Sequence, residues 1–201
     1  MAQPRDLPLA EILQLLEPGY MPIETGYFVQ PNGDCQVRAL TRMPGCKGKM
    51  LDWWFGYIKD TATYKKWHPQ AHAYFEWDEK WKPGHYIGAT HISHEYLGTE
   101  LKKLKMKFFD PAEILDTTKF KAASVGAVIC IDVLDIEKNT PDGHMVHLVR
   151  DTYFGCELRS RMWLKGAPLA AGKAVLQHAS EEFGNLADFL ADLYQKENRG
   201  N

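Results

Sequence analysis

Histidine and glutamate are the side chains of this chain whose spacing best suits catalysis or metal binding. Seven of the eight histidines fall within residues 68–94 and 144–147. His178 and Glu182 stand four residues apart in a predicted helix, so their side chains can converge on one point. Glu182 also falls inside the apolar arc of that helix, where a carboxylate is costly unless it is paired or metal-bound. The pair indicates either a hydrogen bond in the core or a metal site, with Glu181 as a solvent residue.

Two other segments can supply further ligands. In an extended HISHE segment Glu95 shares a face with His91, and parity leaves open whether that face is buried or belongs to an exposed edge strand. In WHPQAH, Pro69 is expected to open a helical turn with His68 at its N-terminus, where the helix dipole favours the neutral ring. His72 would follow one turn later. A capping or packing histidine is the alternative for this segment.

Two imidazoles and two carboxylates form the predicted ligand set, which consists of His68, Glu95, His178 and Glu182. Nitrogen and oxygen ligands without thiolate suit zinc, and also manganese, iron or nickel. Such an ion is a Lewis acid for a substrate oxygen. The four cysteines form no CxxC pair, and GxGxxG, GxSxG and complete HExxH motifs are missing from the sequence. A cysteine-rich zinc site, a dinucleotide site and a serine hydrolase are therefore not supported.

The elements that must position these residues follow from hydrophobic spacing. Apolar residues at helical spacing predict four helices, at residues 7–17, 50–58, 63–67 and 170–196. Alternating residues predict a hairpin that turns at residues 31–34 and a run of antiparallel strands through residues 86–165. A curved antiparallel sheet wrapped around the long helix buries both and leaves a cavity between them. We therefore expect an α+β fold.

Composition limits the domain count and the classes of function. A chain of 201 residues suits one domain, 1–201, with an N-terminal helical extension at 1–19 and the main domain at 20–196. The formal net charge of −2 gives no case for binding nucleic acid or an anionic membrane. We expect no signal peptide and no membrane span, because the apolar runs are short or interrupted. A cytoplasmic protein with reduced cysteines is predicted, and a homodimer is the assembly considered.

Several short motifs, in order, resemble the 2,4-diacetylphloroglucinol hydrolase family, which includes phloretin hydrolases. These motifs are YKKWHPQAH, HISHEYLG, RDTYFGCELRSRMWLKG and HASEE, within about residues 45–185. The resemblance implies a START-like helix-grip fold and a zinc ion held by two His and two Glu. It also implies hydrolysis of the bond between an aromatic ring and an acyl group. By motif the ligands are His68, Glu95 (with Glu100 as the nearby alternative), His178 and Glu182.

The resemblance also suggests which residues contact the substrate. His147 matches a family histidine near the phenolic oxygens of the substrate, and we expect His147 and Tyr153 to be catalytic. Tyr64, His72 and His91 are expected to bind the substrate. The high aromatic content of 12% would supply apolar walls for a flat ligand.

Strand parity makes a further prediction about His147. In HMVHLVRD, His144 and His147 lie on opposite faces, so one of them must face the cavity. The resemblance implies that it is His147.

The predicted function is zinc-dependent cleavage of an acyl group from a phenolic ring or β-dicarbonyl carbon. The substrate would be a small aromatic or polyketide-like molecule such as an acylphloroglucinol or another polyphenol. The alternatives are a cyclase, isomerase or decarboxylase in the same cavity, and a carrier of apolar ligands. A carrier does not need a charged pair such as His178 and Glu182 in its apolar stripe.

Overall fold

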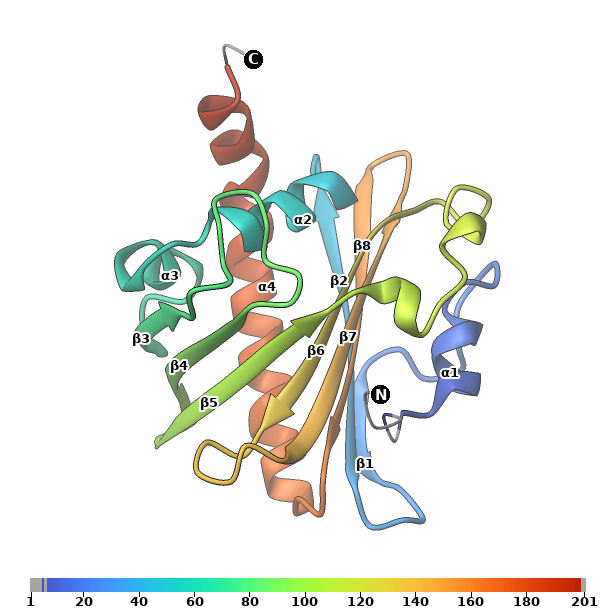
Figure 1. Cartoon of the computed structure of the whole chain (residues 1–201). Helices are drawn as coiled ribbons and strands as arrows, with labels where there is room; N and C mark the ends of the chain where they lie inside the picture. Colours follow the sequence, from blue (N-terminus) through green and yellow to red (C-terminus); the bar gives the residue numbers. More distant parts are fainter. Residues whose placement is uncertain (1–4, 6, 200–201) are drawn as a thin grey trace.

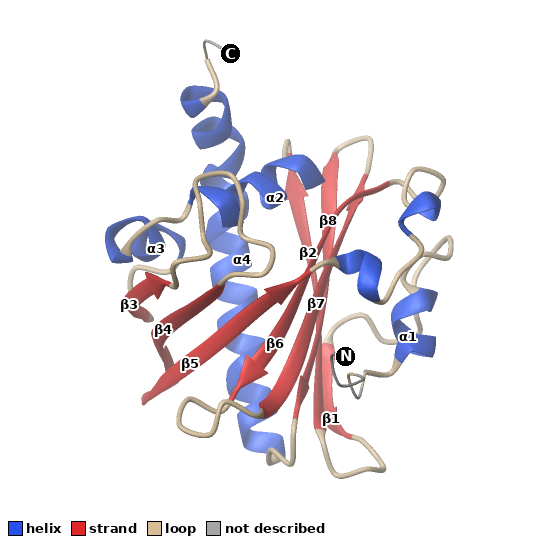
Figure 2. Ribbon diagram, in the orientation of Figure 1, coloured by secondary structure: helices blue, strands red, loops and turns tan. Residues whose placement is uncertain are grey.

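The computed structural model describes residue 5 and residues 7–199, which form one sheet with a long helix across it (Figures 1 and 2). In this part of the chain eight strands make one antiparallel sheet in the order β1-β2-β8-β7-β6-β5-β4-β3. The strands are β1 (Gly26–Val29), β2 (Cys35–Pro44), β3 (His72–Trp77), β4 (Thr90–Leu97), β5 (Glu100–Phe109), β6 (Val125–Leu134), β7 (Pro141–Asp151) and β8 (Gly155–Leu164). The α-helices are α1 (Leu9–Gln14), α2 (Gly48–Tyr57), α3 (Thr61–Trp67) and α4 (Leu169–Glu197). None of these helices is both long and apolar enough to cross a membrane.

Helix α4 crosses one face of the sheet, here called the inner face (Figure 1). Its apolar side chains, including Phe183, Leu186 and Leu190, are buried in a core shared with the sheet, α2 and α3. The α+β helix-grip prediction is confirmed, and the helix predicted at 170–196 extends one residue further at each end. Because α4 lies along the sheet, it brings His178 and Glu182 over the strands that carry the other candidate ligands.

The start of α4 lies very close to the β1–β2 hairpin, and Gly172 permits this approach. A Cβ atom at position 172 would lie 2.4 Å from the Sγ atom of Cys35 and 3.2 Å from the Cβ atom of Tyr27. Gly184, two turns of α4 beyond His178, has no heavy atom within 4 Å of the corresponding position. Helix α4 is therefore tightly packed at Gly172 and has free space beside Gly184.

The opposite face of the sheet, here called the outer face, carries a second core. Ile12 and Leu15 of the N-terminal segment are fully buried there with Val146 and Leu148 of β7. Figure 1 shows α1 on this side of the sheet, away from α4. Strand β8 is buried along almost its whole length because both faces are covered. Residues 7–16 of the predicted N-terminal extension thus pack as a layer on the outer face.

A buried ion-pair network ties the N-terminal segment to β8. The carboxylate of Glu24 accepts hydrogen bonds at 2.5 Å from Nη2 of Arg159 and from Nη2 of Arg161. Burial alone would raise the pKa of Glu24, but the two arginines and the backbone N–H of Met21 lower it to about 2. Glu24 is therefore ionised at neutral pH and is the nearest charged partner of the buried Arg159 and Arg161.

Candidate metal centre and active site

Three imidazoles and two carboxylates meet where α3, β3, β4 and α4 come together. His68 directly follows α3, His72 begins β3, Glu95 lies on β4, and His178 and Glu182 project from α4. The ring centroids of the three histidines lie 5.0–5.6 Å from one another. Ligand atoms of His72, Glu95 and His178 all lie within 4.8 Å of one another, and all three residues are buried. This convergence of nitrogen and oxygen donors suits a divalent metal ion.

Glu95 belongs to the buried face of β4, which settles the parity left open by the sequence. His91, Ser93 and Glu95 are all buried, whereas Tyr96 is exposed. Glu100, the nearby alternative ligand, is exposed and paired with a lysine on the same strand. One carboxylate oxygen of Glu95, Oε2, lies 3.3 Å from Nε2 of His178.

The other oxygen of Glu95, Oε1, accepts hydrogen bonds from Ser93, at 2.8 Å, and from Tyr64. Burial alone would raise the pKa of Glu95, but the His178 ring 3.3 Å away and the other neighbouring imidazoles hold it well below its usual range. The carboxylate is therefore charged. Its Oε1 atom accepts two hydrogen bonds, and its Oε2 atom is directed at His178.

His72 presents a free nitrogen lone pair to the cluster. Its Nδ1 atom lies 3.1 Å from the backbone carbonyl of Tyr64, and a carbonyl only accepts, so Nδ1 carries the proton. Nε2 therefore carries the lone pair in the neutral tautomer, lies 3.5 Å from Oε2 of Glu182, and has no hydrogen-bond partner. A buried nitrogen without a partner is uncommon, and this one points toward two carboxylates. His72, expected to bind substrate, thus lies in the converging group.

His178 lies between the two carboxylates. Its Nε2 atom is 3.3 Å from Glu95 and 3.7 Å from Glu182, at angles that make no hydrogen bond. Burial alone would lower the pKa of His178, but the two carboxylates raise it to about 9. The cluster therefore favours a positive charge at this point, which a proton or a metal ion can supply.

His68 lies at the edge of the cluster, contrary to the helix-terminus argument. It follows the last residue of α3, and Pro69 belongs to a turn into β3, so no helix begins there. Its Nε2 atom pairs at 3.2 Å with Glu181, which is exposed as expected but is not free of contacts. The pKa of His68 is lowered by burial and by the two neighbouring histidines, not by a helix dipole. The structure therefore brings His72 rather than His68 into the converging group.

A small pocket connects the cluster to the surface. It has a volume of about 150 Å³ and is lined by residues that include His68, His178 and Glu181. Among the described residues, aromatic rings such as Trp54, Trp67 and Phe183 fill space between α4 and the sheet where the sequence predicted a larger cavity. Ligand pockets usually have volumes of ~300–1,000 Å³. The pocket beside the cluster is therefore smaller than a usual ligand pocket.

The two histidines of β7 lie on opposite faces, as parity requires. His147 is on the inner face, with its ring centroid 5.2 Å from that of Phe183 on α4. Its Nδ1 atom lies 2.8 Å from Oγ of Ser160, and burial lowers its pKa to about 4, so the ring is neutral. His144 is on the outer face and pairs with Asp132 at 3.0 Å. A neutral inner imidazole can accept or deliver a proton.

Two other predicted site residues have contrasting surroundings. Tyr153 is fully exposed in the turn between β7 and β8, so the pocket position expected for it is wrong in this structure. His91 is buried among the rings of Phe75, Trp77 and Phe108, and neither of its ring nitrogens has a hydrogen-bond partner. Burial lowers the pKa of His91 to about 4, so it too is neutral.

Ser93 is a site residue to which the sequence analysis gave no role. Its hydroxyl is fully buried and donates to Glu95. The signal was its position two residues before Glu95 on the same strand face, which becomes informative only once that face is known to be buried.

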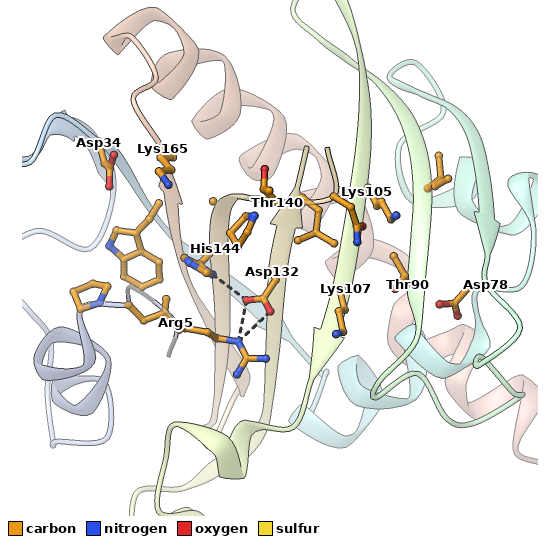
Figure 3. Close-up of a pocket in the computed structure, with 18 of the residues that line it drawn as sticks. Arg5, Asp34, Asp78, Thr90, Lys105, Lys107, Asp132, Thr140, His144 and Lys165 are labelled. Carbon is orange, nitrogen blue, oxygen red and sulfur yellow. Dashed lines mark hydrogen bonds and ion pairs between the residues drawn. The ribbon is translucent and has the colours of Figure 1, made fainter. Parts of the chain in front are cut away.

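A much larger hollow lies on the outer face, remote from this chemistry. It has a volume of about 1040 Å³ and its lining includes Arg5, Asp132, His144 and Lys107. Figure 3 shows Arg5 and His144 both directed at the carboxylate of Asp132. The hollow shares no residue with the histidine–glutamate cluster, so its size does not make it the active site.

Solved structures support the fold alone. The crystal structure of Ara h 8.0201 is similar with a TM-score of 0.52 and 11% identity, over 79% of this chain and 99% of that one. The solution structure of KanY protein gives a TM-score of 0.51 and 10% identity, over 77% of this chain and 97% of that one. At such identities the likeness concerns the path of the backbone.

Sequence comparison gives the family. The 2,4-diacetylphloroglucinol hydrolase of Pseudomonas protegens is 28% identical over 94% of this chain and 73% of that protein. The phloretin hydrolase of Eubacterium ramulus is 26% identical over 86% of this chain and 72% of that protein. The family model described as DAPG hydrolase PhiG domain matches residues 7–170, most of the chain. The chain therefore belongs to the DAPG hydrolase family.

Proposed function

We propose that this chain is a zinc-dependent hydrolase that cleaves the carbon–carbon bond between an acyl group and a phenolic ring or β-dicarbonyl carbon. The observation that carries the proposal is the buried cluster at the inner face, in which His72 and His178 present unpartnered nitrogens beside Glu95 and Glu182. The names of the relatives supply the substrate class, a phenol that bears an acyl group.

The proposed ligands are His72, Glu95, His178 and Glu182. His72 replaces the sequence prediction of His68, because His68 is turned to Glu181 at the pocket mouth. Two carboxylates neutralise a 2+ ion, which lowers the free-energy cost of burying that ion in apolar surroundings. Zinc, when bound, would polarise the acyl carbonyl or acidify a water molecule.

The chemistry requires a proton at the ring carbon. An acylated polyphenol that tautomerises to its keto form has a tetrahedral ring carbon, so the bond to the acyl group becomes that of a β-diketone. Water oxygen adds to the acyl carbon, the carbon–carbon bond breaks, and its electron pair goes to the ring as an enolate. The enolate takes up a proton, and a carboxylic acid is released. Neither a serine nor a cysteine nucleophile is needed.

His147 is the proposed residue for this proton transfer. It is neutral at working pH, it faces the inner core, and its Nδ1 atom is held by Ser160, which leaves Nε2 for exchange. His91 is the proposed contact for a second substrate oxygen, because both of its nitrogens are buried without partners. A cytoplasmic location and a homodimer remain predictions of the sequence.

Heavy-oxygen water tests the reaction. Purified protein with a measured zinc content should convert an acylphloroglucinol in H₂¹⁸O to a carboxylic acid that carries the label. A product with the mass of the substrate would indicate a cyclase or isomerase, and release of carbon dioxide would indicate a decarboxylase. Binding without turnover would indicate a carrier. Each of these three results would contradict the proposal.

A further inference from the structure

Tyr64 touches two of the proposed ligands with three different parts of the residue. Its backbone carbonyl accepts from Nδ1 of His72, its ring stacks on the ring of His72, and its hydroxyl donates to Oε1 of Glu95. The stacked rings have centroids 3.8 Å apart and an angle of 6° between their planes. No sequence pattern predicts this, because His72 and Glu95 follow Tyr64 by 8 and 31 residues.

Each contact fixes a property that a metal ligand needs. The carbonyl sets the proton on Nδ1 and so leaves the lone pair of Nε2 directed at the cluster. The stacked ring fixes the plane of His72. The hydroxyl, together with Ser93, occupies Oε1 of Glu95 and leaves Oε2 for the cluster. Buried donors of this kind orient ligands and raise their affinity for metal.

The same contacts leave Tyr64 little capacity to bind substrate. Its side chain is only 2% exposed, and its one hydroxyl proton is committed to Glu95. His72 covers one part of the ring, while Phe75 and Trp67 pack against the rest. A substrate hydroxyl would have to displace Glu95 in order to accept a hydrogen bond from Tyr64.

We propose that Tyr64 is a positioning residue that orients His72 and Glu95 for metal binding, rather than a residue that contacts the substrate. This inference rests on the proposed metal site. It assigns to Tyr64 a role different from the substrate-binding one that the sequence resemblance implies.

Zinc affinity of the Tyr64→Phe variant tests the assignment, measured by competition with a chromogenic chelator. Loss of the hydroxyl should weaken zinc binding by about 10–100-fold, while KM for an acylphenol at saturating zinc stays near the wild-type value. Ser93→Ala, which removes the other donor to the same oxygen, should also weaken zinc binding. The matched control is Tyr86→Phe, because Tyr86 is equally buried and donates to a carboxylate, Asp52, outside the cluster.

Several results would overturn the assignment. Wild-type zinc affinity in Tyr64→Phe with a raised KM would make Tyr64 a substrate contact. Unchanged affinity and unchanged KM would make it a packing residue, and equal weakening in Tyr86→Phe would show a general effect on the fold. Wild-type protein that binds zinc but hydrolyses no acylphenol would refute the proposed reaction while leaving the positioning role standing. Wild-type protein that binds no zinc would refute both.

Discussion

Replacing Gly172 with alanine tests how tightly the start of α4 is seated on the sheet. The new Cβ atom would lie 2.4 Å from Sγ of Cys35, which is fully buried. Overpacking of this kind typically costs about 1–3 kcal/mol, and the better helix propensity of alanine returns at most about 1 kcal/mol. After the full helix-propensity gain, we expect a net loss of up to about 2 kcal/mol, or up to roughly 8 °C in Tm for a chain of this size.

Gly184→Ala is the matched control, because it makes the same substitution in the same helix. With no heavy atom within 4 Å of the added methyl group, it should stabilise the protein by up to about 1 kcal/mol. Thermal and urea unfolding of both variants would show changes of opposite sign. If Gly172→Ala were as stable as Gly184→Ala, the close approach of α4 to the β1–β2 hairpin would be wrong.

Other substitutions test the metal site, the inner histidine and the outer ion pair. Glu182→Ala should lose bound zinc in metal analysis and Glu181→Ala should retain it, so equal zinc in both would exclude Glu182 as a ligand. His147→Ala should lower turnover by about 10²-fold or more at full zinc content. His144→Ala should leave turnover unchanged, and equal turnover in the two variants would remove His147 from the mechanism. Glu24→Gln should lower the free energy of unfolding by about 3 kcal/mol at pH 7, because Arg159 loses its charged partner and Arg161 keeps only the more distant Glu11. The folded pKa of Glu24 is depressed from 4.5 to about 2, so its contribution is present above pH 4.5 and disappears as the pH falls toward 2. Urea unfolding should therefore show the difference from wild type shrinking over that range, and a constant difference would contradict the ion pair.

Features with a local cause were predictable from the sequence. The apolar arc of α4 depends on a 3.6-residue period within one segment, and the structure shows the expected helix with His178 and Glu182 on neighbouring turns. Strand alternation likewise placed His144 and His147 on opposite faces. These patterns persist because residues nearby in sequence determine them.

The error at WHPQAH has a different origin. Pro69 is compatible with the first turn of a helix and with a loop, so the local signal was ambiguous. The choice is made by pairing between β3 and β4, in which His72 is the register partner of Glu95. Such pairing between residues far apart in the chain is not visible in either segment alone. For the same reason the sequence did not reveal that aromatic rings fill the space between α4 and the sheet.

The strand order has a consequence for how the chain is made. Strand β2 lies between β1 and β8, and Cys35 pairs with Leu164 while Pro44 pairs with Gly155. About 110 residues separate Pro44 from Gly155, and synthesis at ~5–20 residues per second needs on the order of ten seconds to add them. During that time the N-terminal hairpin exposes an unpaired strand edge and the apolar residues of α1 have no sheet to cover. Newly made protein should therefore be most prone to aggregate, and most dependent on chaperones, before β8 leaves the ribosome.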